Sequence, residues 1–206
     1  MREFPPIDRQ AEMAASQTVF FTDAEFEGRP VRTSRANYLA FLSMRGTEVE
    51  GEVNKLRTMF AEHLPEVLER DVICLLTSRN WRNHNIACAA IAAGFVTDSS
   101  LEALWKCIHD GSWTSPQLVA TAAYVDSSFS VRALHLLADD STYFKSLVPL
   151  AEIFAAEHDV ASLQIRPVAA IVQEARTIDR DNSGAIGTHW LANLRTVFGL
   201  NFKRWA

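Results

Sequence analysis

The chain has 206 residues, of which 48% are hydrophobic and 22% charged, so it is long enough for one buried core and its composition excludes wholesale disorder. Its 20 basic and 25 acidic residues give a net charge of -5, which disfavours nucleic acid as a partner unless the basic residues gather on one face, and which suits a basic protein partner. The N-terminus lacks a secretory signal, no run approaches the roughly 18 apolar residues of a spanning helix, and three cysteines make an odd number, so we expect a soluble cytoplasmic protein with reduced thiols.

The N-terminal part and the rest of the chain differ in their patterning. Residues 1–33 carry three scattered prolines and no sustained helical periodicity, so we expect an irregular lead-in that packs aromatic side chains onto the body. Residues 34–206 are expected to form a single all-α domain. Apolar residues recur there at helical spacing within 34–46, 47–64, 65–81, 83–94, 98–111, 114–126, 129–140, 143–159, 166–178 and 188–199.

Four helix starts have recognisable capping signals. Ser34 is expected to be the N-cap of the helix within 34–46. Asn83 is expected to be the N-cap of the helix that ends near Gly94, because a side-chain oxygen there satisfies a free backbone amide. Ser99 and Glu102 have capping-box spacing. Ser115 is expected to be an N-cap, with the proline that follows it at the first helical position.

An internal repeat emerges when the helical segments are aligned. The string LERDVIC at 68–74 matches LEALWKC at 101–107, and Trp81 then aligns with Trp113, at offsets of 33 and 32 residues. A third copy within 130–154 is suggested by periodicity alone. A repeat of this length made of two short helices predicts a helical solenoid, in which each pair hides its apolar face against its neighbours.

The kind of solenoid follows from which repeat motifs are present. Neither the ankyrin nor the tetratricopeptide pattern is found. A HEAT-like or armadillo-like stack of antiparallel helix pairs therefore fits best, with a compact irregular helical bundle as the alternative. Such a stack would present an extended concave surface to a partner.

Histidine and cysteine are too loosely arranged to predict a metal site or a nucleophile. His84 and Cys88 are four residues apart, and Cys74, Cys107 and His109 could complete a zinc site, but no CxxC or HExxH motif occurs. Cys107 and His109 are two apart, so on a helix they point in different directions. We therefore expect buried thiols, no bound metal and no cofactor.

Two aspartate pairs could suggest acid/base work or Mg²⁺ binding, namely Asp139 with Asp140 and Asp179 with Asp181. Both pairs lie between expected helices, where aspartates commonly cap helices and form turns. Capping is the favoured interpretation, and no phosphate-binding glycine loop or nucleophile elbow is present. We therefore expect no catalytic residue.

The repeat separates packing positions from recognition positions. Trp81 and Trp113 recur, so we interpret them as wedges in the turn between paired helices, with Asn83 and Ser115 as recurring structural caps. Residues that differ between copies are freer to bind a partner, the other interpretation being ordinary solvated surface. These candidate partner-binding residues are Arg79, Arg82, His84, Asn85, Asp110, Ser112 and Gln117. Trp105, Trp190 and Trp205 are either buried or exposed interface anchors.

The strings LLTSRNWRNHNIACAAIA and GSWTSPQLVATAAYVD resemble small cytoplasmic bacterial proteins built on HEAT-like helices, including immunity proteins encoded beside polymorphic or contact-delivered toxins. The resemblance covers about residues 66–126 and depends on the tryptophan turn and the helical framework. It implies a non-enzymatic protein that binds a cognate toxin and occludes its active site. It transfers no toxin-contacting residue to this chain.

Three functions are therefore compared below. The first is a protein-binding module, most specifically an immunity protein. The second is a helical-repeat enzyme of the DNA alkyl-base glycosylase kind, which would need basic residues converging on one groove beside an aspartate and tryptophans. The third, a scaffold or adaptor, cannot be separated from the first by sequence.

Overall fold

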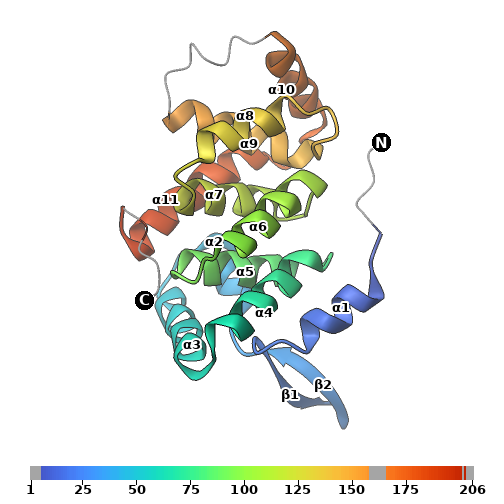
Figure 1. Cartoon of the computed structure of the whole chain (residues 1–206), viewed down its shortest axis with the longest axis vertical. Helices are drawn as coiled ribbons and strands as arrows, with labels where there is room; N and C mark the ends of the chain where they lie inside the picture. Colours follow the sequence, from blue (N-terminus) through green and yellow to red (C-terminus); the bar gives the residue numbers. More distant parts are fainter. Residues whose placement is uncertain (1–5, 158–165, 201, 203–206) are drawn as a thin grey trace.

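The structure is a computed structural model that describes residues 6–157, 166–200 and 202. Within these residues the protein is mostly helical, with a single two-stranded sheet (Figure 1). This confirms the all-α class. The helices are α1 (Arg9–Ser16), α2 (Tyr38–Ser43), α3 (Glu48–Glu62), α4 (Pro65–Thr77), α5 (Trp81–Ala92), α6 (Asp98–Asp110), α7 (Ser115–Val125), α8 (Phe129–Leu137), α9 (Phe144–Glu157), α10 (Arg166–Ile178) and α11 (Ser183–Phe198); the strands are β1 (Phe21–Phe26) and β2 (Arg29–Ser34). No helix among the described residues is both long enough and apolar enough to cross a membrane.

The repeated part of the sequence forms two successive helix pairs, α4 with α5 and α6 with α7. Helix α4 packs against α6 and α5 against α7, and α8 and α9 form a further pair where the third repeat copy was expected (Figure 1). Helix α11 packs against both α7 and α9. Because α11 reaches past the α8–α9 pair to contact α7, the C-terminal part of the protein departs from a regular stack in which each repeat contacts only its neighbours. The HEAT-like form remains a prediction.

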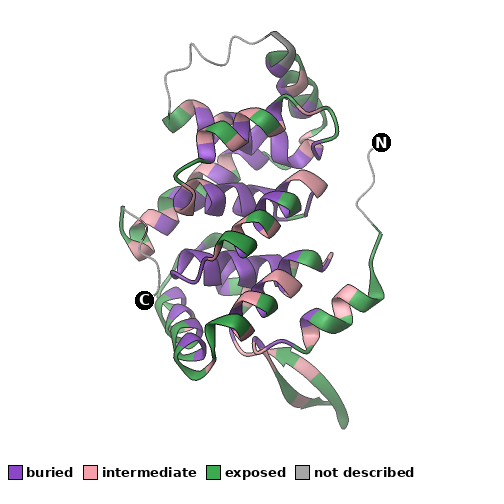
Figure 2. Ribbon diagram, viewed as in Figure 1, coloured by how far each residue is buried: buried purple, intermediate pink, exposed green. Residues whose placement is uncertain are grey.

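The core follows the line of α5 and α7, which are buried on nearly all sides (Figure 2). Small residues make this possible, because the run from Ala87 to Ala93 holds five alanines and one cysteine around a single isoleucine. Alanine lets neighbouring helices approach closely and still favours the helix. The sequence thus places the two most buried helices at the centre of the molecule.

Helix α2 is anchored by side chains from two later helices, α7 and α11. The last carbonyls of a helix have no partner within the helix, so they need donors from elsewhere. Here three donors come from α7 and α11. Trp190 Nε1 bonds to Phe41 O at 3.0 Å, Gln117 Nε2 to Leu42 O at 3.2 Å, and Asn193 Nδ2 to Ser43 O at 2.8 Å.

The N-terminal part is more regular than the sequence suggested. Helix α1 is capped by Asp8, whose side chain accepts from two backbone amides. Strands β1 and β2 form an antiparallel hairpin, and its turn residues Glu27 and Gly28 both have positive φ, at 51° and 74°. Such a pair of angles matches the right-handed twist of the strands. The expectation of an irregular lead-in is therefore wrong, because a local turn and cap create structure without apolar periodicity.

The predicted cap of α5 is wrong by three residues. Asn80 is the N-cap, and its side chain accepts from the backbone amide of Arg82 at 3.1 Å. Asn83 lies inside the helix, is buried, and donates from Nδ2 to Ser78 Oγ at 3.0 Å. Two asparagines three residues apart offer the same capping chemistry, and the tertiary fold selects the first of them.

The starts of α2, α6 and α7 also differ from expectation. Asn37 is the N-cap of α2, whereas Ser34, the expected cap, is the last residue of β2. Thr97 and Ser100 form the capping box of α6, in place of Ser99 and Glu102. In α7 the N-cap is Thr114, so Ser115 is the first helical residue and its Oγ instead binds the backbone of the preceding loop. The prediction of Ser115 as N-cap is therefore wrong by one residue.

Candidate functional site

An apolar pocket lies between α2 and the N-terminal ends of α5, α7, α9 and α11. It has a volume of about 470 Å³, within the ~300–1,000 Å³ typical of ligand sites. We call it the Trp pocket. Its lining includes Trp81, Trp113, Gln117, Lys145, Asp181 and Trp190.

Trp113 stands at this pocket with an exposed side chain, although its ring is held in place. It is 58% exposed, and the ammonium of Lys145 lies 4.3 Å from the ring centroid. A cation over an indole face is attracted by the ring quadrupole. The Lys145 ammonium is itself buried and lies 2.6 Å from Asp181 Oδ2. The contact with Lys145 therefore fixes the position of the Trp113 ring and leaves most of the ring accessible to solvent.

The floor of the Trp pocket is fixed by buried side chains. Trp190 and Gln117 are only 2% and 5% exposed, and each donates a hydrogen bond to a carbonyl of α2. A buried indole N–H and a buried amide both need such a partner. The pocket is therefore preformed on one side by the bonds that hold α2 in place.

A second pocket of about 390 Å³ adjoins the first across Trp81 and Trp113, which line both. We call it the Arg pocket, because Arg79 and Arg82 line it. Arg82 stacks 4.6 Å from the Trp81 ring centroid, and its Nε donates to the hydroxyl of Tyr38 at 3.1 Å. The guanidinium of Arg82 is thereby held on an aromatic surface.

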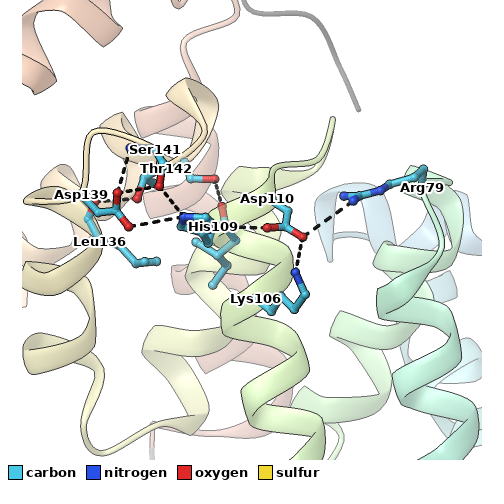
Figure 3. A network of polar contacts seen from close by, with 10 residues as sticks. Arg79, Lys106, His109, Asp110, Leu136, Asp139, Ser141 and Thr142 are labelled. Carbon is cyan, nitrogen blue, oxygen red and sulfur yellow. Dashed lines mark hydrogen bonds and ion pairs between the residues drawn. The ribbon is translucent and has the colours of Figure 1, made fainter. Parts of the chain in front are cut away.

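Asp110 lies in a surface network of polar contacts (Figure 3). Its carboxylate is 2.7 Å from Lys106 Nζ, 3.0 Å from His109 Nδ1 and 3.7 Å from the guanidinium of Arg79. Partial burial raises the pKa of Asp110, but the hydrogen bonds from Lys106 and His109 outweigh it, so the pKa is lowered. Arg79 and Asp110, both candidates from the sequence, are brought together by this network.

His84 is not a surface residue, so its prediction as a partner-binding residue is wrong. It is 1% exposed, with Nε2 at 2.7 Å from Ser78 O and Nδ1 at 2.6 Å from Ser112 Oγ. A carbonyl can only accept, so Nε2 carries the proton and Nδ1 accepts from the serine. Ser112 is also buried, so its hydroxyl is used in this contact with His84 and is not presented to a binding partner.

Asn85 and Gln117 were likewise expected on the surface, and both are buried. Gln117 is covered by α2, whose Leu42 carbonyl accepts its hydrogen bond, and α2 also packs against α5, the helix that carries Asn85. Gln117 still borders the Trp pocket, whereas Asn85 is 0% exposed and lines neither the Trp pocket nor the Arg pocket. Neither amide atom of Asn85 has a hydrogen-bond partner within the described part of the chain.

Replacing Asn85 with leucine is expected to stabilise the protein, because it removes two unpartnered polar atoms from the core at similar volume. We expect a gain of about 1–2 kcal/mol in the free energy of unfolding. Asn83→Leu is the matched control on the same helix and should cost about 1 kcal/mol, since its amide bonds to Ser78. Urea unfolding of both variants measures this, and a loss of stability in Asn85→Leu would contradict it.

The two tryptophans that we interpret as wedges lie in different surroundings. Trp81 is half-buried and packs edge-on against Tyr38, with ring centroids 5.6 Å apart. Trp113 lies in the turn between α6 and α7, as expected, but it is exposed, and its role as a wedge stays a prediction. Trp105 and Trp190 are buried, and Trp205 lies outside the described residues.

The cysteines are held as neutral thiols, and two of the aspartates accept backbone hydrogen bonds. Burial raises the pKa of all three thiols, to about 12 for Cys88, so they are neutral and weakly reactive at neutral pH. No group of three potential ligands able to hold a metal occurs among the described residues. Asp179 accepts from Ser183 N at 2.9 Å at the start of α11, whose N-cap residue is Asn182, and Asp139 accepts from Ser141 N in a turn. These two contacts agree with the expected roles of the aspartates in capping and turns, whereas Asp181 instead pairs with Lys145.

Sequence reasoning missed three contributors to the Trp pocket, Arg45, Lys145 and Asp181 in its ion-paired role. One signal was present in the sequence. Lys145 follows two aromatic residues and precedes an apolar run at the start of its helix, where a lone cation is out of place unless it is paired. Its partner Asp181 is 36 residues away, so the pair depends on the fold.

Comparison with known proteins does not identify a relative: no protein-family model matches the chain, and no curated protein or solved structure matches it.

Proposed function

We propose that this chain is a non-enzymatic protein-binding module whose recognition surface is the Trp pocket. The observation that carries this proposal is Trp113, an indole that is 58% exposed and yet held by the Lys145 ammonium at the edge of a preformed apolar pocket. Tryptophan and arginine dominate the energetic centres of protein interfaces. A side chain that is already ordered loses little conformational entropy when a partner covers it.

The most specific form of this proposal is an immunity protein that binds a cognate toxin and occludes its active site. Two observations support binding over catalysis. The carboxylate of Asp181 is tied to the Lys145 ammonium at 2.6 Å, and the thiols near the centre are buried with raised pKa values. Neither arrangement favours a free base or nucleophile. A scaffold or adaptor would use the same surface.

Truncating Trp113 is expected to disrupt the natural complex without unfolding the protein. Trp113→Ala should weaken binding of a captured partner roughly 30-fold, as expected for an interface hot spot. The measurement is affinity capture from the organism that encodes the chain, followed by titration of the purified partner. Val131→Ala is the matched control, because Val131 is also exposed, at 61%, and lies on α8 away from the pocket.

Two outcomes would count against the proposal. One is a partner that binds Trp113→Ala and the wild type equally well. The other is the absence of any stoichiometric partner, combined with deletion of the gene leaving cells as resistant to their own and sibling toxins as before. A toxin gene beside this one would favour the immunity form over a general adaptor.

One specific observation favours a second candidate, an enzyme acting on nucleic acid of the alkyl-base glycosylase kind. The Trp pocket places Asp181 near tryptophans and near the cations Arg45 and Lys145, which is the combination that such an enzyme needs. The net charge of -5 and the ion pair of Asp181 weigh against it. A gel shift at low salt and an assay for release of alkylated bases decide: protein that neither binds DNA nor releases bases excludes this candidate.

A further inference from the structure

The charge around the two pockets is opposite in sign to the charge of the whole chain. The chain carries a net charge of -5, yet the linings of the Trp pocket and the Arg pocket include four cations, Arg45, Arg79, Arg82 and Lys145. Their lining carboxylates are two, Glu12 and Asp181. A basic partner suits the whole-chain charge, but a local excess of cations attracts an acidic one.

Two of these cations lack a carboxylate of their own. Lys145 is paired with Asp181, and Arg79 lies 3.7 Å from Asp110. Within residues 6–157, 166–200 and 202, neither Arg45 nor Arg82 forms an ion pair. These two arginines are therefore the free charges of the combined site.

Arg82 is also oriented for recognition. Its guanidinium lies 4.6 Å from the Trp81 ring centroid and 5.4 Å from that of Tyr38, while its Nε donates to the Tyr38 hydroxyl. The two terminal nitrogens have no hydrogen-bond partner among the described residues. A planar guanidinium held in this way can donate two parallel hydrogen bonds to one carboxylate.

From this arrangement we propose that the occupant of the Trp pocket is an acidic peptide segment of the partner protein. An aromatic or large aliphatic side chain enters the apolar cavity beside Trp113 and Trp190, and flanking carboxylates pair with Arg82 and Arg45. This inference rests on the proposed function and names the chemistry of the partner. It suits the pocket size, since about 470 Å³ accommodates one bulky side chain.

A nucleic acid is the weaker match to the same charges. A phosphate backbone gains affinity from many neutralised phosphates, and this site offers two free cations. Asp181 and Glu12 at the pockets and the net charge of -5 would repel a continuous strand.

The test begins with a peptide library displayed on phage and selected against the full-length protein, with Trp113→Ala protein used to remove binders that ignore the pocket. We expect the enriched peptides to share one aromatic or large aliphatic residue with at least two nearby carboxylates. Enrichment of basic or uncharged peptides overturns the inference. So does the absence of any enrichment that depends on the pocket.

A labelled peptide from that selection then reports on the arginines by fluorescence anisotropy. Arg82→Gln and Arg45→Gln are each expected to weaken binding about five- to tenfold at low salt, as for the loss of a charged hydrogen bond at a partly exposed site. Arg57→Gln is the matched control, because Arg57 is exposed on α3 and lines neither pocket, and it should stay within about twofold. Circular dichroism of each variant verifies the fold.

The outcomes separate this inference from the proposed function. A natural partner that requires Trp113 while Arg82→Gln and Arg45→Gln bind it normally overturns the acidic segment and leaves the binding function standing. A single-stranded oligodeoxythymidylate that binds more tightly than every selected peptide, and that Arg82→Gln weakens, overturns both in favour of nucleic acid.

Discussion

Gly111→Ala is expected to destabilise the protein by roughly 3–5 kcal/mol, the combined cost of overpacking and of backbone strain. Gly111 has φ of 96°, a region that side chains with a Cβ adopt at a cost. A Cβ built there would lie 2.1 Å from Cγ of Tyr143. That ring cannot move away easily, because Tyr143 is buried, packs on Phe144 and donates its backbone amide to His109 O at 2.9 Å.

Gly46 provides a control that separates the two causes of this loss. Its φ is 95°, almost the same angle, but a Cβ there would meet nothing within 4 Å. Gly46→Ala should therefore cost only about 1 kcal/mol, from strain alone. Urea unfolding of both variants gives the comparison. If both variants lose the same free energy of unfolding, the contact with Tyr143 is not the reason that position 111 requires glycine.

This glycine also bears on the candidate site. Gly111 lines the Arg pocket and precedes Trp113 by two residues. Its contact with Tyr143 fixes the α6–α7 loop against the start of α9, which carries Lys145. A partner that requires the ordered indole should therefore bind Gly111→Ala more weakly than Gly46→Ala, at temperatures where both remain folded.

Acidification is expected to remove about 3 kcal/mol of stability through His84 alone. Burial lowers the pKa of His84 from 6.5 to about 4, since a buried imidazolium would lose its hydration. Between these two values the unfolded chain binds a proton and the native protein does not. Stability therefore rises with pH across this window, and it falls as the pH drops from about 6.5 towards 4.

The measurement is the free energy of unfolding by urea at a series of pH values. For the wild type, the free energy of unfolding should rise with pH between about 4 and 6.5 with a slope close to that of one bound proton. His84→Gln should lose this slope. His135→Gln, a change at an exposed histidine on α8, should retain it. If His84→Gln does not fold, the native imidazole can be titrated by NMR. A native His84 that protonates near pH 6.5 contradicts the prediction.

The positions of the helices could be largely predicted from the sequence. Apolar spacing marks α3 and most later helices to within a few residues, because the hydrogen bonds of a helix join residues four apart and its buried face repeats along the chain. Caps were predicted less well. At α5 and α7 the predicted cap differs from the observed one, Asn83 against Asn80 and Ser115 against Thr114, since neighbouring polar residues offer equivalent chemistry.

The candidate site was predicted only in part. Arg79 and Arg82 do line a pocket, but of the two tryptophans assigned to packing, Trp113 is exposed. Repetition in sequence suggested equal roles for Trp81 and Trp113. Only Trp113 has the Lys145 ammonium over its ring, and that cation comes from α9, outside the repeat alignment.

By itself the sequence determines the helical class and the helix pairs of the repeat, because these depend mainly on residues near one another in the chain. The tertiary structure decides which polar residues are buried and which aromatic is exposed. The residues 78–94, SRNWRNHNIACAAIAAG, contain examples of both. By its sequence each of His84 and Asn85 resembles a surface residue, but in the fold His84 bonds to Ser112 and Asn85 is fully buried. Burial by segments distant in the chain leaves no trace in local periodicity.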